Sequence, residues 1–260
     1  MLADELHQLA LRQLADYDGR TPNRIFSGPL ELTVTEAYEI QHQLVWLRER
    51  RGESVIGYKV GCTSTVIQRQ LGIHEPIYGR IFSTGCFASG ARISGANYAN
   101  LAIEGELAVR LAKDLLEPLA ADEEYAEAIE TVFPVIELHH YRLRSARPCC
   151  QELIASNGMH AGMVWPEERG GGPCSPAKGC EIKVRIETGA GGIVAESSAV
   201  SQPIGSLRWL ALRLATFGLC LVRGQVVLTG SPMKLYPVTP GHRIVVETTC
   251  FGKSCAEVVS

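Results

Sequence analysis

The stretch Asn100-Leu-Ala-Ile-Glu-Gly-Glu-Leu-Ala-Val-Arg-Leu111 decides how this chain folds. Apolar residues alternate there with small or charged ones, and a period of two predicts a β-strand over 101–111. Residues i and i+2 of a strand point to the same face, so Glu104 and Glu106 lie side by side in a run otherwise suited to burial. Two adjacent carboxylates are costly in such a place unless a cation neutralises them.

A third carboxylate strengthens the case for a metal over the alternative of a solvated strand face. Glu137 interrupts a second apolar run, Thr131-Val-Phe-Pro-Val-Ile-Glu-Leu138. Charged residues in such runs are rarely buried without a partner. Three carboxylates that leave open positions for water and substrate suit Mg²⁺ or Mn²⁺. The sequence therefore predicts one divalent-metal site built from Glu104, Glu106 and Glu137.

Composition and charge exclude several classes of protein. The 260 residues are 46% hydrophobic, enough for a real core, and the net charge is −3. Arg48-Glu-Arg-Arg51 is the only basic cluster, which argues against nucleic acid as a partner. No apolar stretch approaches the length of a membrane span, and the first residues predict an amphipathic helix in place of a signal peptide. Nine cysteines without a Cys-x-x-Cys pair predict reduced thiols, and we expect a cytoplasmic protein.

The periodicity of apolar residues, and the Gly and Pro residues that separate the periodic segments, predict an α+β fold. The N-terminal section, residues 1–78, is mainly helical and carries a loop that closes over the site, whereas residues 79–260 form a β-rich catalytic domain. The predicted helices are 1–17, 35–51 with Thr35 as N-cap, 65–71, 149–155 and 204–217. The predicted strands are 54–60, 101–111, 131–138, 181–187, 193–200, 225–229 and 243–249. Residues 169–176 are predicted to form a surface loop.

Several short motifs, in this order, resemble those of a known family. They are Ala37-Tyr-Glu-Ile-Gln41, Ile56-Gly-Tyr-Lys-Val-Gly-Cys-Thr-Ser64, Leu71-Gly-Ile-His-Glu-Pro-Ile-Tyr-Gly79, Ile103-Glu-Gly-Glu-Leu-Ala108, Val135-Ile-Glu137, Gly224-Gln-Val-Val-Leu-Thr-Gly-Ser231 and Pro240-Gly241. Nearly the whole chain resembles the 2-oxopent-4-enoate hydratase and 4-oxalocrotonate decarboxylase family of the fumarylacetoacetate hydrolase superfamily. The resemblance implies that superfamily's mixed β-sandwich roll, a last strand pair after Pro240-Gly241, and a homo-oligomer.

The resemblance also implies roles for individual residues. It places Glu104, Glu106 and Glu137 at the metal-ligand positions and Lys59 beside the carboxylate or 2-oxo group of a small 2-oxo acid. An ordinary surface lysine is the alternative for Lys59. The residues expected to bind substrate are Tyr78, Arg142, Asn157, Gly230 and Ser231. Arg142, Arg144 and Arg147 are candidates to hold a distal carboxylate, or else are solvated.

The chain also departs from the family pattern. Ile77 stands where the hydratases typically carry an acid, and the decarboxylases resemble this chain there. Glu137 is followed by Leu-His139-His140-Tyr-Arg142 where an Asp-Ser-Arg pattern is usual. Farther on, Ala155-Ser-Asn-Gly-Met-His160 replaces an Asp-Asn-Ala-Ser-like stretch.

The additional histidines suggest a base that activates water. The candidates are His139, His160 and the loop pair His74-Glu75, with satisfied structural histidines as the alternative. The wider superfamily includes hydrolases that split 1,3-diketo acids with activated water. We therefore predict hydrolytic C–C cleavage of an acylpyruvate-type 2,4-dioxo acid, such as maleylpyruvate or fumarylpyruvate, giving pyruvate and a second acid in aromatic-compound catabolism.

Two other hypotheses stay open. The same metal site suits hydration of 2-hydroxypenta-2,4-dienoate or decarboxylation of a 4-oxalocrotonate-type acid. A protein of another class would keep the fold and bind a metal or an oxo acid without turning it over.

Overall fold

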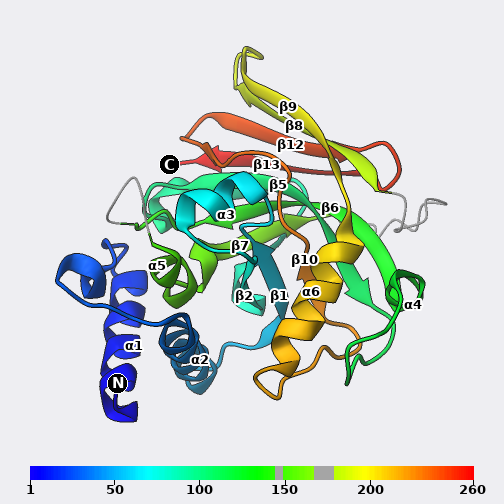
Figure 1. Ribbon diagram of the computed structural model, residues 1–260. Helices are drawn as coiled ribbons and strands as arrows, with labels where there is room; N and C mark the ends of the chain where they lie inside the picture. The colour runs from blue at the N-terminus through cyan, green and yellow to red at the C-terminus, as the bar shows by residue number, and fades with distance from the viewer. Residues whose placement is uncertain (144–148, 167–178) are drawn as a thin grey trace.

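A computed structural model describes residues 1–143, 149–166 and 179–260, and Figure 1 shows two sheets with helices below them. The larger sheet of the described chain has the order β2-β1-β10-β5-β6-β7-β3, with β11 beside β5, and the second has the order β4-β13-β12-β8-β9. The larger sheet contains β1 Val55–Gly61, β2 Ile77–Phe82, β3 Cys86–Ala88, β5 Ala102–Leu111, β6 Ile129–His139, β7 His160–Trp165, β10 Val226–Leu228 and β11 Tyr236–Pro237. The second contains β4 Ala91–Ser94, β8 Cys180–Thr188, β9 Ile193–Ser201, β12 His242–Thr248 and β13 Lys253–Val259.

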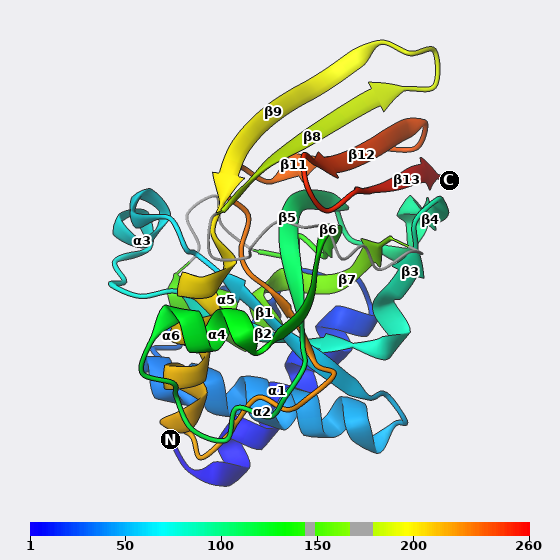
Figure 2. The same ribbon diagram turned by 90° about the vertical axis from the view of Figure 1, so that its right-hand side faces the viewer.

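The three longest helices lie on the side of the larger sheet that faces away from the second sheet (Figure 1 and Figure 2). The α-helices are α1 Ala3–Asp18, α2 Val34–Arg50, α3 Thr65–Leu71, α4 Asp122–Glu127, α5 Cys150–Ala155 and α6 Pro203–Ala215. Short 3-10 helices are η1 Arg24–Ser27, η2 Ser83–Gly85, η3 Gly95–Asn97 and η4 Asn157–Met159. Thr33, not the predicted Thr35, caps α2, because its hydroxyl accepts from the backbone N–H of Glu36 and the Glu36 carboxylate accepts in return.

The antiparallel pair β5 and β6 forms the centre of the larger sheet and confirms the strand predicted from alternation at 101–111 and the strand predicted from the apolar run at 131–138. Its register places Glu104 opposite Glu137. On one face of β5, Ile103 packs under the second sheet, while Leu107 packs with α2 and α6. On the other face, Ala108 packs with residues such as Phe133 inside the curled half-barrel of the larger sheet. The alternation of β5 thus separates a packing face from a concave face that carries the carboxylates.

The two sheets are held together by an apolar layer, and a glycine controls how closely they approach. Ile103 and Ile136 of the larger sheet meet Val184 and Val246 of the second. A Cβ at Gly105 would lie 2.3 Å from Val184 Cγ2 and 3.0 Å from Val246 Cγ2. Only a glycine at position 105, between the two glutamates, permits this contact.

Other predictions have mixed outcomes. The predicted boundary after residue 78 falls within β2, which pairs with β1 in the larger sheet, and the division into two units stays a prediction. Residues 144, 147 and 169–176, named above, lie outside the described residues. No described helix is long and apolar enough to cross a membrane. Seven described cysteines are free, whereas Cys250 is disulfide-bonded, so the expectation of reduced thiols does not extend to Cys250.

We expect Gly105→Ala to destabilise the fold by about 1–3 kcal/mol, because the added methyl group forces the two sheets apart. The melting temperature should fall by about 2–10 °C in differential scanning calorimetry. Gly205→Ala is the matched control, since a Cβ at Gly205 in α6 meets nothing within 4 Å. Equal melting temperatures for the two variants would show that the sheets do not pack through Gly105.

Candidate active site and metal centre

Charged side chains from four strands converge on the concave face of the larger sheet. Lys59 comes from β1, Glu104 and Glu106 from β5, Glu137 and His139 from β6, and His160 from β7. The strand order brings them together, since β10 joins β1 to β5 and β6 lies between β5 and β7. The strand phase also places His139 on the same face as Glu137, as the sequence predicts. The predicted glutamates, Lys59, His139 and His160 therefore form one group.

Glu137 lies at the centre of this group and is fully buried. Its Oε1 atom lies 2.7 Å from Nδ1 of His160 and 3.3 Å from Nζ of Lys59. Its Oε2 atom lies 3.4 Å from Nε2 of His139. Burial alone would raise the pKa of Glu137, but the charges of Lys59 and His139 hold that pKa well below its usual range. Glu137 is therefore an ionised carboxylate that accepts from its neighbours.

The ionised Glu137 decides the state of the two groups on Oε1. Because a carboxylate only accepts, Nδ1 of His160 donates and Nε2 carries the lone pair. Burial lowers the pKa of His160, so the imidazole is neutral. Burial also opposes the charge of Lys59, but Glu137, Glu104 and Glu106 outweigh it and raise the pKa of Lys59. The ammonium also donates to the carbonyl of Gly158 at 3.4 Å.

The ligand atoms fit a divalent cation. Ligand atoms of Glu104, Glu137 and His139 lie within 4.8 Å of one another, and two of these residues are buried. Nε2 of His139 lies 3.3 Å from Glu104, yet it makes no hydrogen bond, and Oε2 of Glu137 has none either. Despite burial, the two carboxylates raise the pKa of His139 to about 9. Buried polar atoms without partners are costly, and a cation would satisfy them. These three residues form a divalent-metal site.

Glu106 differs from the predicted ligand set. One of its oxygens accepts from the backbone N–H of Gly230, and Oε1 is buried without a partner. Burial and the neighbouring Glu137 raise the pKa of Glu106 well above its usual range. Glu106 does not belong to the group of mutually close ligand atoms, in which His139 stands instead. Its role as a ligand stays a prediction.

Two of the predicted substrate-binding residues lie at this group. The backbone of Gly230 contacts Glu106, and Ser231 Oγ donates to the carbonyl of Gly105 at 3.0 Å. Gly230 has a φ of +90°, and a Cβ there would lie 2.6 Å from Cγ2 of Thr63. The turn after β10 therefore packs directly against Glu106, the backbone of Gly105 and the end of β1.

The structure does not bring the other predicted residues to the group. The hydroxyl of Tyr78 lies 3.0 Å from Nε2 of His42, on the α2 side of the sheet. Asn157 donates to the carbonyl and accepts from the N–H of Arg80, so its amide holds η4 to β2. Arg142 is buried near α1, with its guanidinium 5.4 Å from the ring centre of Tyr17.

The loop pair His74-Glu75 and His140, the residue after β6, do not contact the metal ligands in the contacts that they make. His74 is exposed, and Glu75 accepts from Nε1 of Trp209 at 3.3 Å. The ring of His140 packs edge-on against Tyr17 of α1, with 4.8 Å between the ring centres, and its Nδ1 accepts from the backbone N–H of Ala99 at 2.9 Å. The sequence missed the carbonyl of Gly158 as a partner of Lys59, because no local pattern signals a contact across 99 residues.

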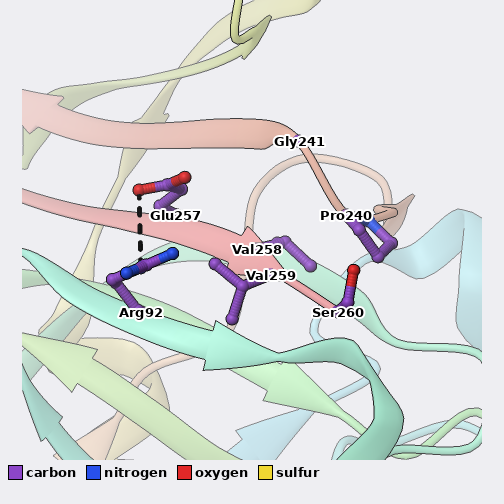
Figure 3. Close-up of a pocket in the computed structure, with 7 residues that line it drawn as sticks. All are labelled: Arg92, Pro240, Gly241, Glu257, Val258, Val259 and Ser260. Atoms are coloured by element: carbon purple, nitrogen blue, oxygen red, sulfur yellow. Dashed lines mark ion pairs between the residues drawn. The ribbon is translucent and has the colours of Figure 1, made fainter.

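A hollow on the second sheet lies around the C-terminal end of β13 (Figure 3). Its walls include Pro240 and Ser260, and the ion pair between Arg92 and Glu257 spans 3.9 Å. Both side chains of that pair are more than half exposed. No residue of the group around Glu137 lines it. This hollow offers no buried ligand atoms and is not part of the candidate site.

Comparisons with known proteins agree with this geometry. The family model "Fumarylacetoacetate (FAA) hydrolase C-terminal" matches residues 74–259. The chain is 30% identical to 2-hydroxyhexa-2,4-dienoate hydratase of Comamonas testosteroni, covering 82% of this chain and 81% of that protein. It is 28% identical to 4-oxalocrotonate decarboxylase of Pseudomonas sp, covering 87% of each. The fold matches 4-oxalocrotonate decarboxylase from Pseudomonas putida G7, complexed with magnesium and adipate, with a TM-score of 0.86 and 22% identity over 100% of this chain and 99% of that one.

These relatives correct the predicted reaction. The sequence predicted hydrolytic cleavage of an acylpyruvate, but the curated relatives are hydratases and decarboxylases, which are lyases. The prediction of a hydrolase was therefore wrong, and the other two reactions named with it have the better support. The additional histidines misled it, since His139 lies among the metal ligands and His74 is exposed.

We expect Glu137→Gln to lower the affinity for Mn²⁺ at least about tenfold in isothermal titration calorimetry, since it removes the charge at the centre of the group. Glu130→Gln, an exposed position on the same strand, is the matched control and should bind as the wild type does. His139→Gln should weaken binding more than Glu106→Gln if the cation takes the three close ligands. The reverse order would restore the predicted set of three glutamates.

Proposed function

The chain belongs to the fumarylacetoacetate hydrolase superfamily, in its 2-oxopent-4-enoate hydratase and 4-oxalocrotonate decarboxylase family, and from this premise we propose that it is a metal-dependent lyase that adds water to a 2-hydroxyalka-2,4-dienoate. The observation that carries the proposal is the buried trio of Glu137, Lys59 and His160. It combines a fixed cation with a neutral imidazole whose Nε2 has no partner. The charge of Lys59 would stabilise the oxygens of a 2-oxo acid, and the imidazole of His160 would transfer its protons.

Lys59 and the metal ligands would hold the acid end of the substrate. Mg²⁺ or Mn²⁺ on Glu104, Glu137 and His139 would supply Lewis acidity toward the 2-oxo oxygen. Lys59 keeps its charge although it is buried, because three carboxylates surround it. Its ammonium is therefore placed to donate to a substrate oxygen at which negative charge develops. The low dielectric of the concave face strengthens that interaction.

His160 is suited to move protons. In the proposed reaction, the 2-hydroxyl of the dienol loses a proton while C5 gains one, which gives a 2-oxo-3-enoate. Water then adds its oxygen to C4, and C3 gains the remaining proton. Glu137 orients the ring of His160 through Nδ1, and Nε2 is free to accept a proton from the 2-hydroxyl or from water. Burial keeps this histidine neutral and hence able to act as a base.

Decarboxylation of a 4-oxalocrotonate-type acid is the second candidate, and Ile77 is the observation that favours it. Ile77 pairs with Gly61 at the end of β1 and is buried. A Cβ at Gly61 would lie 3.1 Å from Nζ of Lys59 and 3.7 Å from Cγ1 of Ile77, so this apolar side chain borders the site. It supplies no proton where the hydratases carry an acid. Decarboxylation needs the same charge stabilisation and fewer proton transfers.

A product assay separates these reactions. The protein is incubated with Mg²⁺ or Mn²⁺ and either 2-hydroxypenta-2,4-dienoate or 2-oxohex-3-enedioate, and the products are identified by mass spectrometry. A 4-hydroxy-2-oxo acid from the dienoate supports the hydratase. Release of CO₂ from the diacid, with no hydration of the dienoate, would favour the second candidate. No turnover of either acid would leave a binding protein.

We expect His160→Gln to reduce kcat about 10²–10⁴-fold on the true substrate, because glutamine preserves a donor toward Glu137 but cannot accept a proton. KM should change little, since Lys59 and the metal ligands stay in place. His7→Gln, on α1, is the control for the same substitution away from the site and should keep normal kcat. A near-normal kcat in His160→Gln, measured in steady-state assays, would assign the proton transfer to another group.

A further inference from the structure

A second hollow lies on the α6 side of the group formed by Lys59, the three glutamates, His139 and His160. It has a volume of about 360 Å³, and its wall includes Gly230 and Thr63. The backbone N–H of Gly230 donates to Glu106, and a Cβ at Gly230 would lie 2.6 Å from Thr63. The hollow is therefore connected to Glu106 through Gly230, on the side where the turn after β10 meets the end of β1.

The lining of this hollow carries no charge among the described residues. Pro76, Val200 and Trp209 give it apolar walls. Its hydroxyl donors are partly engaged within the protein: Ser206 Oγ donates to the carbonyl of Thr229 at 2.6 Å, and Thr229 Oγ1 donates to that of Leu107 at 2.8 Å. A ligand entering this space meets carbon atoms and polar groups, but no cation.

One wall of the hollow is fixed by the loop before β2. Nε1 of Trp209 donates to one oxygen of Glu75 at 3.3 Å, and Arg213 lies 3.6 Å from the other. Glu75 and the lining residue Pro76 are neighbours in this loop. Glu75 therefore ties the loop to α6 and holds the indole in place, and its role as a base stays a prediction.

We propose that this hollow receives the distal end of the substrate and selects 2-oxo acids whose distal end is uncharged, with Trp209 as the residue that determines this specificity. The proposal rests on the proposed function, because it takes the acid end to be held by the metal ligands and Lys59. A distal carboxylate would lose its hydration without gaining a cation. The N-terminus of α6 favours an anion only weakly, and its first residue, Pro203, has no N–H to offer.

The test compares two stable acids of equal length. 2-Oxohexanoate and 2-oxoadipate differ only in the distal carboxylate, and neither has the double bond that the reaction needs. Their dissociation constants are measured with the full chain and Mg²⁺ by isothermal titration calorimetry. We expect 2-oxohexanoate to bind at least about tenfold more tightly, which is a difference of about 1.4 kcal/mol. Equal binding, or tighter binding of 2-oxoadipate, overturns the proposal.

Variants locate the distal end. Trp209→Ala should weaken 2-oxohexanoate at least about threefold and leave pyruvate unchanged, because pyruvate is too short to reach the indole. Trp209→Phe should keep most of the affinity, which shows that the wall is required and that the variant is folded. Unchanged 2-oxohexanoate binding in Trp209→Ala would place the distal end elsewhere and overturn the proposal.

A charge introduced at the rim gives an independent check. Gln202 is exposed and lines the hollow, so Gln202→Arg should tighten 2-oxoadipate relative to 2-oxohexanoate, whereas Gln202→Met should not. An unchanged ratio in Gln202→Arg counts against the proposal. These equilibria do not depend on turnover. Hydration without discrimination between the two acids would sink this inference alone, and discrimination without hydration would sink the proposed function alone.

Discussion

The arrangement of the larger sheet depends on one buried carboxylate, that of Glu137. An isolated buried ion is strongly unfavourable, and removing one partner of a buried pair is costly because it leaves the other uncompensated. Glu137 is ionised only because Lys59, His139 and His160 surround it. These partners come from β1, from β6 itself and from β7, so the strand order and the charge balance require each other. The fold of the larger sheet and the charges of the site therefore stabilise each other.

Glycines, which have no side chain, leave room for the long side chain of Lys59. A Cβ at Gly61 would lie 3.1 Å from Nζ, and one at Gly158 would lie 3.1 Å from Cδ. On the neighbouring strand, a Cβ at Gly79 would lie 2.6 Å from the carbonyl oxygen of Asn157. The glycines thus leave the space that the lysine side chain fills, with its Nζ 3.3 Å from Glu137. An ammonium fixed in this way needs little reorganisation when a substrate oxygen acquires charge.

The parts of the site that the sequence predicted lie where local pattern carries spatial information. Alternation in β5 predicted that Glu104 and Glu106 share one face, and in β6 the spacing of two residues put Glu137 and His139 on one face. The same reasoning fails for Tyr78. Every residue of β2 is buried, so the strand shows no alternation from which to choose a face, and Tyr78 points to α2. Contacts such as Asn157 with Arg80 join segments far apart in the chain, which a single sequence does not reveal.

The error about the reaction has a related cause. Stabilising an enolate beside a 2-oxo group is common to hydrolysis, hydration and decarboxylation of such acids, so Lys59 and the metal ligands do not distinguish among them. In the binding mode proposed above, the groups that would meet the distal carbons come from the loop before β2, from the turn after β10 and from α6. These segments are joined by contacts between residues far apart in the chain, such as Trp209 with Glu75. Sequence periodicity therefore predicts the end of the site that carries Lys59 and the metal ligands. The segments at the distal end are brought together only by the tertiary structure, so periodicity does not predict the reaction.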